Sequence, residues 1–350
     1  MDQFESSKAD TMQPGVVRRK PIRASQETLV RETVLRADAA LPLLFEPAVD
    51  GVNLKEWGTT HRERVMDRLS THGAILFRRF DVGTIGEFES VMQAIAGDLL
   101  DYSYRSTPRS QVSGRIYTST EYPAHQTIPQ HNEMSYTRSW PMVVGFFCAE
   151  PAAEGGETPI ADSRAVFRQV DPAIRDRFEK RSVMYVRNYG DALDLPWQEV
   201  FQTEDRKVAE AFCRRSGIEF EWKDQDRLRT SQVCQAVAAH PVTGEMVWFN
   251  QAHLFHVSSL GSEIRDALLG DASELPRNAY YGDGAPIDEA DLDHIRGAYD
   301  RETIAFAWQK GDILLVDNML VSHGRRPYRG SRKIVVAMAQ ACAGPAGSGT

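Results

Sequence analysis

The sequence is poor in cysteine and has no long hydrophobic run, and these two absences exclude whole classes of protein. Its four cysteines, at positions 148, 213, 234 and 342, are too far apart to form a CxxC metal or redox pair. A chain of 350 residues can bury a core without disulfide bonds, so we expect a reducing, cytoplasmic compartment. No window approaches about 18 consecutive apolar residues, and residues 1–15 have no apolar stretch. We therefore expect neither a membrane span nor a signal peptide.

An excess of positive charge and glycine-rich nucleotide motifs are lacking as well. The chain has 41 Lys and Arg against 49 Asp and Glu, which gives a formal net charge of −8. Nucleic acids and anionic membranes select basic surfaces, so we expect neither as a partner. Neither GxGxxG nor GxxxxGK(S/T) occurs, so no motif supports a nucleotide-binding site.

Short apolar runs, turns and amphipathic stretches predict a mostly β protein with helices around a β-core. The predicted strands are 74–77, 143–148, 183–186, 218–222, 246–249, 303–308, 313–316 and 334–339, and the predicted helices are 63–69, 85–95, 163–180, 204–215, 262–269 and 288–299. Strands on both sides of a helical segment do not favour a series of βαβ units. The first 40 residues are polar and predict a flexible arm, with order beginning near residues 41–44.

The most informative local feature is the run His131-Asn132-Glu133. Residues i and i+2 on a strand point to the same face, so this imidazole and this carboxylate could bind one ion, with Asn132 pointing the other way. A third ligand must come from elsewhere, and His323, which follows the apolar run 313–316, is the natural candidate. Two histidines and one carboxylate form the facial triad of non-haem Fe(II) oxygenases, which leaves positions open for a co-substrate and O₂.

The order of HxE, Thr158, a distant histidine and Arg332 resembles the taurine-dioxygenase-like family of Fe(II)/2-oxoglutarate oxygenases. Twenty-four residues separate Glu133 from Thr158, 164 separate Thr158 from His323, and Arg332 follows His323 by nine. The resemblance extends over about residues 42–340. Particular stretches are similar to the branch typified by the syringomycin-biosynthesis aspartyl hydroxylase, namely HNEMSYTRSWP (131–141), GGETPIADSR (155–164), YVRNYG (185–190), WFNQAHLFHVSSL (248–260) and HGRRPYRGSRKIVVAMA (323–339).

The resemblance implies a double-stranded β-helix, or jelly-roll, core. It implies an arm at 1–40, a single oxygenase domain at 41–342 with a helical and loop insert around 163–300, and a disordered tail at 343–350. Fe(II) would be bound by His131, Glu133 and His323. The Thr158 hydroxyl would contact 2-oxoglutarate, and Arg332 would pair with its distal carboxylate, which a planar guanidinium binds in a bidentate manner.

The basic segment around Arg332 leaves alternatives for that last role. In the family the arginine usually lies slightly farther past the distal histidine, so Lys333 is a rival. Three further cations lie close by, Arg325, Arg326 and Arg329. The same segment could instead bind a substrate carboxylate or the acidic face of a carrier protein, or be a solvated patch.

The acidic ligand Glu133 bears on the reaction. Related halogenases have a small residue in its place, so the resemblance implies hydroxylation, with desaturation or cyclisation as alternatives and 2-oxoglutarate and O₂ as co-substrates. The implied substrate is an amino acid such as aspartate, free or tethered to a peptidyl carrier protein, in the making of a specialised peptide. Candidate substrate-binding residues are Asn132, Asn250, His253 and Arg326. The run NxxHxxH at 250–256 is interpreted as a loop that lines the substrate pocket; plain structure and a second metal site are the alternatives.

Two other classes of function are compatible with the same residues. The triad could hold zinc for hydrolysis, in which case Thr158 and Arg332 would have no function. The chain could also be a non-catalytic binding member of the fold. Metal content and succinate formation discriminate between these classes.

Overall fold

The computed structural model describes residues 29–344 except 38, 103, 105–108, 120–121, 191–194, 261–264 and 266–274. The strands are β1 (Val30–Arg36), β2 (Ala39–Pro47), β3 (Ala74–Phe77), β4 (Gln111–Ser113), β5 (Ile116–Thr118), β6 (Ile128–His131), β7 (Ser139–Glu150), β8 (Glu154–Gly155), β9 (Ile160–Asp162), β10 (Val183–Tyr189), β11 (Glu219–Trp222), β12 (Leu228–Cys234), β13 (Val237–Ala239), β14 (Met246–Trp248), β15 (Arg277–Tyr281), β16 (Ile313–Asp317), β17 (Val321–Arg325), β18 (Tyr328–Arg329) and β19 (Lys333–Ala343). The helices are α1 (Leu54–Thr60), α2 (Arg62–His72), α3 (Ile85–Ala96), α4 (Ser163–Gln169), α5 (Pro172–Arg181), α6 (Trp197–Phe201), α7 (Arg206–Ser216), α8 (Ala252–Phe255) and α10 (Glu289–Glu302).

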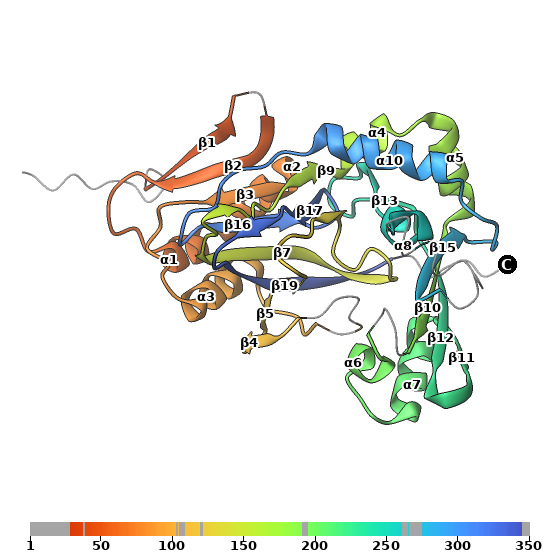
Figure 1. Cartoon of the computed structure of the whole chain (residues 1–350). Coiled ribbons are helices and arrows are strands. Elements are labelled where there is room, and N and C mark those ends of the chain that lie inside the picture. Colours follow the sequence, from red (N-terminus) through yellow and green to blue (C-terminus); the bar gives the residue numbers. More distant parts are fainter. Residues whose placement is uncertain are drawn as a thin grey trace, which may run out of the picture.

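The predicted β-core is confirmed as a large sheet packed against a small one. The large sheet has the strand order β1-β2-β3-β16-β7-β19-β5-β4, and the small sheet has the order β6-β17-β9 (Figure 1). Strand β16 is buried along its whole length, because alternate side chains enter two different cores. Ile313 and Leu315 pack with α1, α2 and α3, whereas Leu314 and Val316 pack toward β9 and β17.

The segment between β9 and β16 forms a second packed region, which we call the insert (residues 163–302). It contains the four-stranded sheet β11-β12-β10-β15 and the hairpin β13-β14. Figure 1 shows it on the right, with α4, α5 and α10 above its strands. The insert has its own apolar core, in which the Phe178 ring lies 5.0 Å from Trp248 and 5.2 Å from Tyr281. The prediction of a helical and loop insert missed strands β12, β13 and β15.

Several helix ends follow directly from local sequence. Thr84 and Glu87 form a capping box at the start of α3, in which each side chain accepts from the other's backbone N–H. The predicted helix at 163–180 is split, because Asp171 caps α5 and Pro172 occupies its first turn. Gly73, at φ 78°, ends α2 directly before β3.

Three sequence predictions need comment. Order begins earlier than residue 41, because β1 pairs antiparallel with β2 and so satisfies its polar backbone groups. The strand predicted at 303–308 is wrong in extent, since only Ile304 forms a bridge, to Ile160. The helix predicted at 262–269 falls largely outside the described residues.

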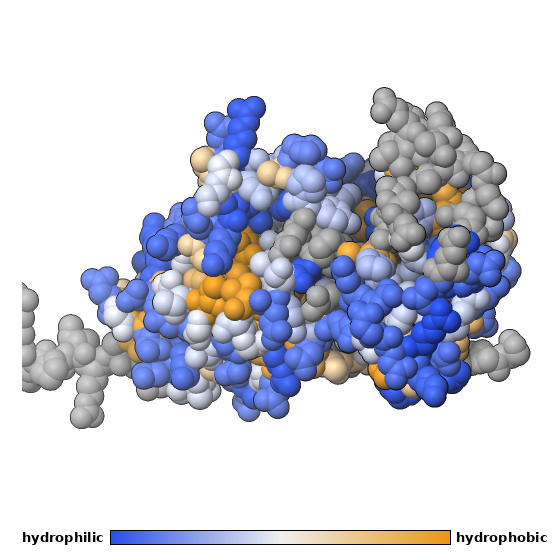
Figure 2. Space-filling model, turned by 60° about the horizontal axis from the view of Figure 1, so that its bottom comes forward, coloured by the Kyte–Doolittle hydropathy of each residue, from blue (hydrophilic) through white to orange (hydrophobic). Residues whose placement is uncertain are grey.

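The surface view in Figure 2 shows a mainly hydrophilic face with a compact hydrophobic area left of centre and smaller ones elsewhere. Among the described helices, none has both the length and the apolar character needed to cross a membrane. All four cysteines are free thiols, and three of them are buried. Burial raises the pKa of Cys148, Cys213 and Cys234 to about 12, so these thiols stay protonated near neutral pH.

Candidate active site

Two histidines and one glutamate come together where the small sheet meets the turn after β6. In the antiparallel pair β6–β17, His323 lies directly opposite His131, and their ring centroids are 4.4 Å apart. One ligand atom from each of His131, Glu133 and His323 lies within 4.8 Å of the other two. Gly324 allows this close pairing, since a Cβ there would lie 2.5 Å from the carbonyl oxygen of Ile128. The structure therefore assembles the predicted triad.

Glu133 is positioned by a turn and not by a continuous strand. Strand β6 ends at His131, and the next residues form a turn in which Met134 has φ 58°. Asn318 fixes this turn by accepting from the Glu133 backbone N–H at 2.7 Å and donating to its carbonyl at 2.8 Å. The sequence correctly predicted that His131 and Glu133 face the same point, but it placed both on one strand, whereas Glu133 lies in a turn. Nothing in the sequence indicated the role of Asn318.

Asn132 points away from the triad, as the alternation predicted, and this corrects its assignment as a substrate residue. Its side chain is fully buried. Its amide donates to the Asn318 carbonyl at 2.7 Å and to the Ser163 hydroxyl at 3.1 Å. Asn132 therefore ties the triad turn to α4 and to the residue that follows β16, and it is not accessible to a ligand.

Both imidazoles are prepared to act as neutral ligands. The Nδ1 of His131 lies 2.9 Å from the Pro129 carbonyl, so it donates there and leaves the Nε2 lone pair for the triad centre. Burial lowers the pKa of His131, and Glu133 partly offsets this effect. Burial and the neighbouring His131 place the pKa of His323 well below its usual range. The buried Nδ1 of His323 has no hydrogen-bond partner within the described residues.

Arg109 contacts the triad, although nothing in the sequence pointed to it. Its Nη2 donates to Glu133 Oε2 at 2.7 Å, and both side chains are almost fully buried. The same oxygen lies 3.9 Å from His323 Nε2. The guanidinium also lies 4.8 Å above the Tyr102 ring. Arg109 thus holds one carboxylate oxygen of the triad at a defined place.

A second group of polar side chains lines a narrow cavity behind the histidines, which we call the Thr158 cavity. His131, Thr158, His323 and Arg332 all line it. The Thr158 oxygen accepts a hydrogen bond from Trp308 Nε1 at 3.1 Å, which leaves its own hydrogen free to donate to a ligand. The structure therefore brings both predicted 2-oxoglutarate residues to the triad.

Arg332 forms no ion pair with a carboxylate in the described part of the chain. It donates to the Gly156 carbonyl at 2.8 Å and to the Ser119 hydroxyl at 3.4 Å. Burial and the nearby Arg325 lower the pKa of Arg332 to about 10. Gly156 makes room for the side chain, since a Cβ there would lie 3.0 Å from Arg332 Cδ. A bound carboxylate would balance this charge, so the site fits a dicarboxylate.

The four rivals of Arg332 are engaged elsewhere or exposed. Arg325 also lines the Thr158 cavity, but it donates to the carbonyls of residues 122, 123 and 126 and so fastens that loop. Lys333 and Arg326 are exposed, and Arg329 lies at the surface 3.5 Å from Glu154. Arg326 lines neither cavity beside the triad, which argues against the predicted substrate role.

A wider cavity of about 220 Å³, which we call the Arg277 cavity, opens on the other side of His131 and Glu133. Ile128, Gln251, Leu254 and Phe255 line it, together with Arg109 and Arg277. The predicted loop at 250–256 thus reaches the cavity, but through residues other than those proposed.

Asn250 and His253 lie behind that loop, so their assignment as substrate residues is corrected. Asn250 is fully buried, donates to the Ala236 carbonyl and accepts from the Ala252 N–H. His253 Nε2 lies 3.0 Å from the Gln130 carbonyl, and burial lowers the pKa of His253 to about 3. Among the described residues only His131, Glu133 and His323 form a potential metal cluster, so the run NxxHxxH forms no second site there.

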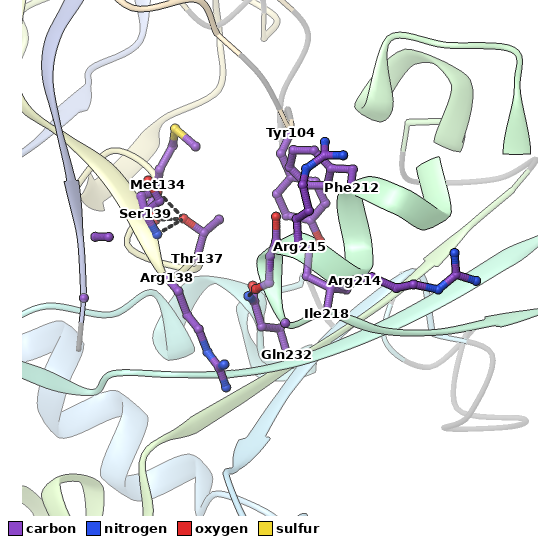
Figure 3. A pocket seen from close by; sticks show the side chains of 14 residues that line it. Tyr104, Met134, Thr137, Arg138, Ser139, Phe212, Arg214, Arg215, Ile218 and Gln232 are labelled. Carbon is purple, nitrogen blue, oxygen red and sulfur yellow. Dashed lines mark hydrogen bonds between the residues drawn. The ribbon is translucent and has the colours of Figure 1, made fainter. Parts of the chain in front are cut away.

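A third and larger cavity, of about 530 Å³, lies between the triad turn and the insert, and we call it the outer cavity. Met134, Arg138, Phe212, Arg214 and Gln232 are among its lining residues. Figure 3 shows the Arg138 and Arg214 side chains pointing away from each other. Arg138 donates to the Val233 carbonyl, and Arg214 pairs with Glu210 at 2.8 Å.

Comparisons with known proteins give the class and the family. Residues 37–338 match the family described as taurine catabolism dioxygenase TauD, TfdA family. The chain is an Fe(II)/2-oxoglutarate-dependent dioxygenase and not a zinc-dependent hydrolase or a non-catalytic binding protein. It belongs to the TauD, TfdA family.

Two curated relatives and one solved structure place the chain further. It is 42% identical over 272 residues to the dapdiamide synthesis protein DdaC of Enterobacter agglomerans, which covers 77% of this chain and 83% of the relative. It is 32% identical over 291 residues to a clavaminate synthase-like protein of Arabidopsis thaliana, which covers 80% of this chain and 85% of the relative. The PvcB protein from Pseudomonas aeruginosa shares the fold, with a TM-score of 0.55, 14% identity and coverage of 92% and 97%.

Proposed function

We propose that this enzyme hydroxylates an amino acid, free or tethered to a carrier protein, in a specialised biosynthetic pathway of the cytoplasm. Iron would be held by His131, Glu133 and His323, and 2-oxoglutarate by Thr158 and Arg332. The observation that carries the proposal is the cluster of three ligand atoms within 4.8 Å, beside a cavity lined by Thr158 and Arg332. The similarity to a dapdiamide synthesis protein supports the biosynthetic role.

The donor set matches the proposed metal. Two imidazoles and one carboxylate leave coordination positions open on one face of the ion. Bound iron with 2-oxoglutarate supplies the oxidising chemistry of this class, in which 2-oxoglutarate and O₂ are consumed and succinate and CO₂ are released.

The chain's own residues position the reactants. The Pro129 carbonyl orients the His131 ring, and Asn318 holds the backbone of Glu133. Trp308 turns the Thr158 hydroxyl so that its hydrogen is free for a carboxylate oxygen. The apolar side chains Ile128, Leu254 and Phe255 line the Arg277 cavity and would exclude water from the reacting C–H bond.

Succinate formation tests the proposal directly. The purified protein is supplied with Fe(II), 2-oxoglutarate and O₂, and free amino acids are compared with the same amino acids loaded on a carrier protein. We expect succinate together with a product heavier by one oxygen atom; a product lighter by two hydrogen atoms would indicate desaturation or cyclisation.

A matched pair of histidine variants provides the control. We expect His131→Ala to abolish iron binding and succinate formation. His72→Ala changes a histidine that lines none of the three cavities, and it should leave both unchanged. Succinate formation at the full rate in His131→Ala would contradict the proposed function.

A further inference from the structure

The Arg277 cavity contains a guanidinium with which no carboxylate of the described residues forms an ion pair. Arg277 lies at the start of β15, and its guanidinium carbon is 5.3 Å from the centroid of the Phe255 ring. Within the described ranges the Arg277 side chain forms no ion pair and no hydrogen bond. An arginine stacked on an aromatic face keeps the edge of its planar fork open to a ligand.

The other charges of this cavity are already matched. Apart from the imidazole of His131, the charged side chains among its described lining residues are Glu133, Arg109 and Arg277. Arg109 and Glu133 pair with each other at 2.7 Å. The cavity wall therefore carries one uncompensated positive charge, at Arg277.

The co-substrate does not account for Arg277. The Thr158 cavity has its own cation, Arg332, and Arg277 does not line that cavity. His131, Arg109 and Ile128 line both cavities, and we assign the Thr158 cavity to 2-oxoglutarate and the Arg277 cavity to the substrate. An anion bound by Arg277 is therefore a part of the substrate.

We propose that Arg277 binds a free carboxylate of the substrate and thereby places the reacting C–H bond at the triad. This inference rests on the proposed function, because it assigns the substrate class of the same site. The carboxylate and the reacting carbon must both fit a cavity of about 220 Å³ with apolar walls. The substrate is then a small carboxylic acid, such as an amino acid with a free carboxylate.

The inference restricts tethered substrates. Linking an amino acid to a carrier protein as a thioester consumes its α-carboxylate. A tethered substrate would therefore need a second carboxylate, on its side chain, to use Arg277. Neutral tethered amino acids are excluded.

The test compares acids with their amides. The probes are the twenty proteinogenic amino acids and their α-carboxamides, each assayed for stimulation of succinate formation by the Fe(II)- and 2-oxoglutarate-loaded enzyme. We expect at least one acid to stimulate, and its amide to have a kcat/KM lower by about 10- to 100-fold, the range for a lost charged hydrogen bond. Arg277→Gln should lower kcat/KM for that acid by a similar factor and remove the preference over the amide. Arg277→Lys, which keeps the positive charge, should restore part of the kcat/KM for the acid and part of the preference over the amide.

Two controls separate this inference from the proposed function. The anaerobic Fe(II)–2-oxoglutarate complex, detected by its visible absorption, should form equally in the wild type and in Arg277→Gln. If neither protein shows this absorption, the proposed function itself is contradicted. Arg326→Gln makes the same chemical change at an exposed arginine outside both cavities, and should alter neither reading. The inference is overturned if no acid stimulates, if the amide equals its acid, or if Arg277→Gln weakens both alike.

Discussion

The Arg277 cavity and the outer cavity differ in how their charged side chains are arranged. The outer cavity is more than twice as large, at about 530 Å³ against about 220 Å³. Its arginines are turned away from one another, and Arg214 is neutralised by Glu210. In the smaller cavity His131, Glu133, Arg109 and Arg277 surround one volume. Function follows the convergence of charged and ligating groups, and not the volume.

The largest effect is expected at the triad. His323→Ala removes one of the three proposed iron ligands, so we expect iron binding to be lost and succinate formation to fall to background. Gln232→Ala in the outer cavity should leave both intact. The two variants are compared by their iron content after reconstitution and by their succinate release. If His323→Ala retained iron as Gln232→Ala does, the triad would not be the iron site.

The next effect is expected at the cation of the Thr158 cavity. Arg332→Gln removes the charge that would pair with 2-oxoglutarate, and losing one partner of such a buried pair costs about 2–5 kcal/mol. We expect the KM for 2-oxoglutarate to rise by about 30-fold or more, with partial recovery in Arg332→Lys. Lys333→Gln, at an exposed neighbour, should not change this KM. If the KM for 2-oxoglutarate rose equally in Lys333→Gln, Arg332 would not be the specific partner of the 2-oxoglutarate carboxylate.

Arg109 tests whether a residue outside the ligand set tunes the metal site. Arg109→Gln leaves the Glu133 carboxylate without its 2.7 Å partner. Loss of such an outer contact typically lowers metal affinity by about 10- to 100-fold. A titration with Fe(II) would measure this, and Arg109→Lys should recover part of the affinity. Unchanged affinity in Arg109→Gln would show that the ion pair does not position Glu133.

A smaller, pH-dependent effect is expected from His253 behind the Arg277 cavity. Burial lowers the pKa of His253 from 6.5 to about 3. Between about pH 3 and pH 6.5 this imidazole is therefore protonated in the unfolded chain and neutral in the folded one. Stability therefore falls as pH drops through this window, by up to about 1.4 kcal/mol per pH unit. His253→Gln should flatten the slope of unfolding free energy against pH between 4 and 6. An unchanged slope, measured by urea denaturation, would contradict the assignment.

The smallest effect is expected in the outer cavity. Arg215→Gln changes an exposed lining residue that forms no ion pair in the described part of the chain. We expect stability to change by less than about 0.5 kcal/mol and succinate formation to stay the same. A clear loss of turnover would show that the outer cavity takes part in the reaction.

The predictable part of the fold is the part written in local patterns. The predicted strand at 74–77 is confirmed as β3, and those at 313–316 and 334–339 lie within β16 and β19. Continuous apolar runs mark these strands because both of their faces are buried. Strand β1 has a mixed burial pattern and depends on β2 for its hydrogen bonds, so its sequence carries no comparable signal. The single-domain organisation stays a prediction.

The site divides in the same way. HxE, Thr158, His323 and Arg332 have a recognisable order along the chain, and the structure brings them together. The substrate candidates Asn132, Asn250, His253 and Arg326 all lie outside the Arg277 cavity. Near a predicted loop, sequence alone cannot tell which side chains face inward, because that depends on the rotation of short turns and helices.

The sequence by itself determined the types of the proposed ligands and their order along the chain, because coordination chemistry requires particular side chains. Only the tertiary structure placed Arg109 on Glu133, Asn318 beside the triad turn and Arg277 in a cavity with His131 and Glu133. Arg109 and Glu133 are 24 positions apart, and Asn318 and Glu133 are 185 apart. Such contacts arise from the packing of the insert and the two sheets, and no local pattern records them.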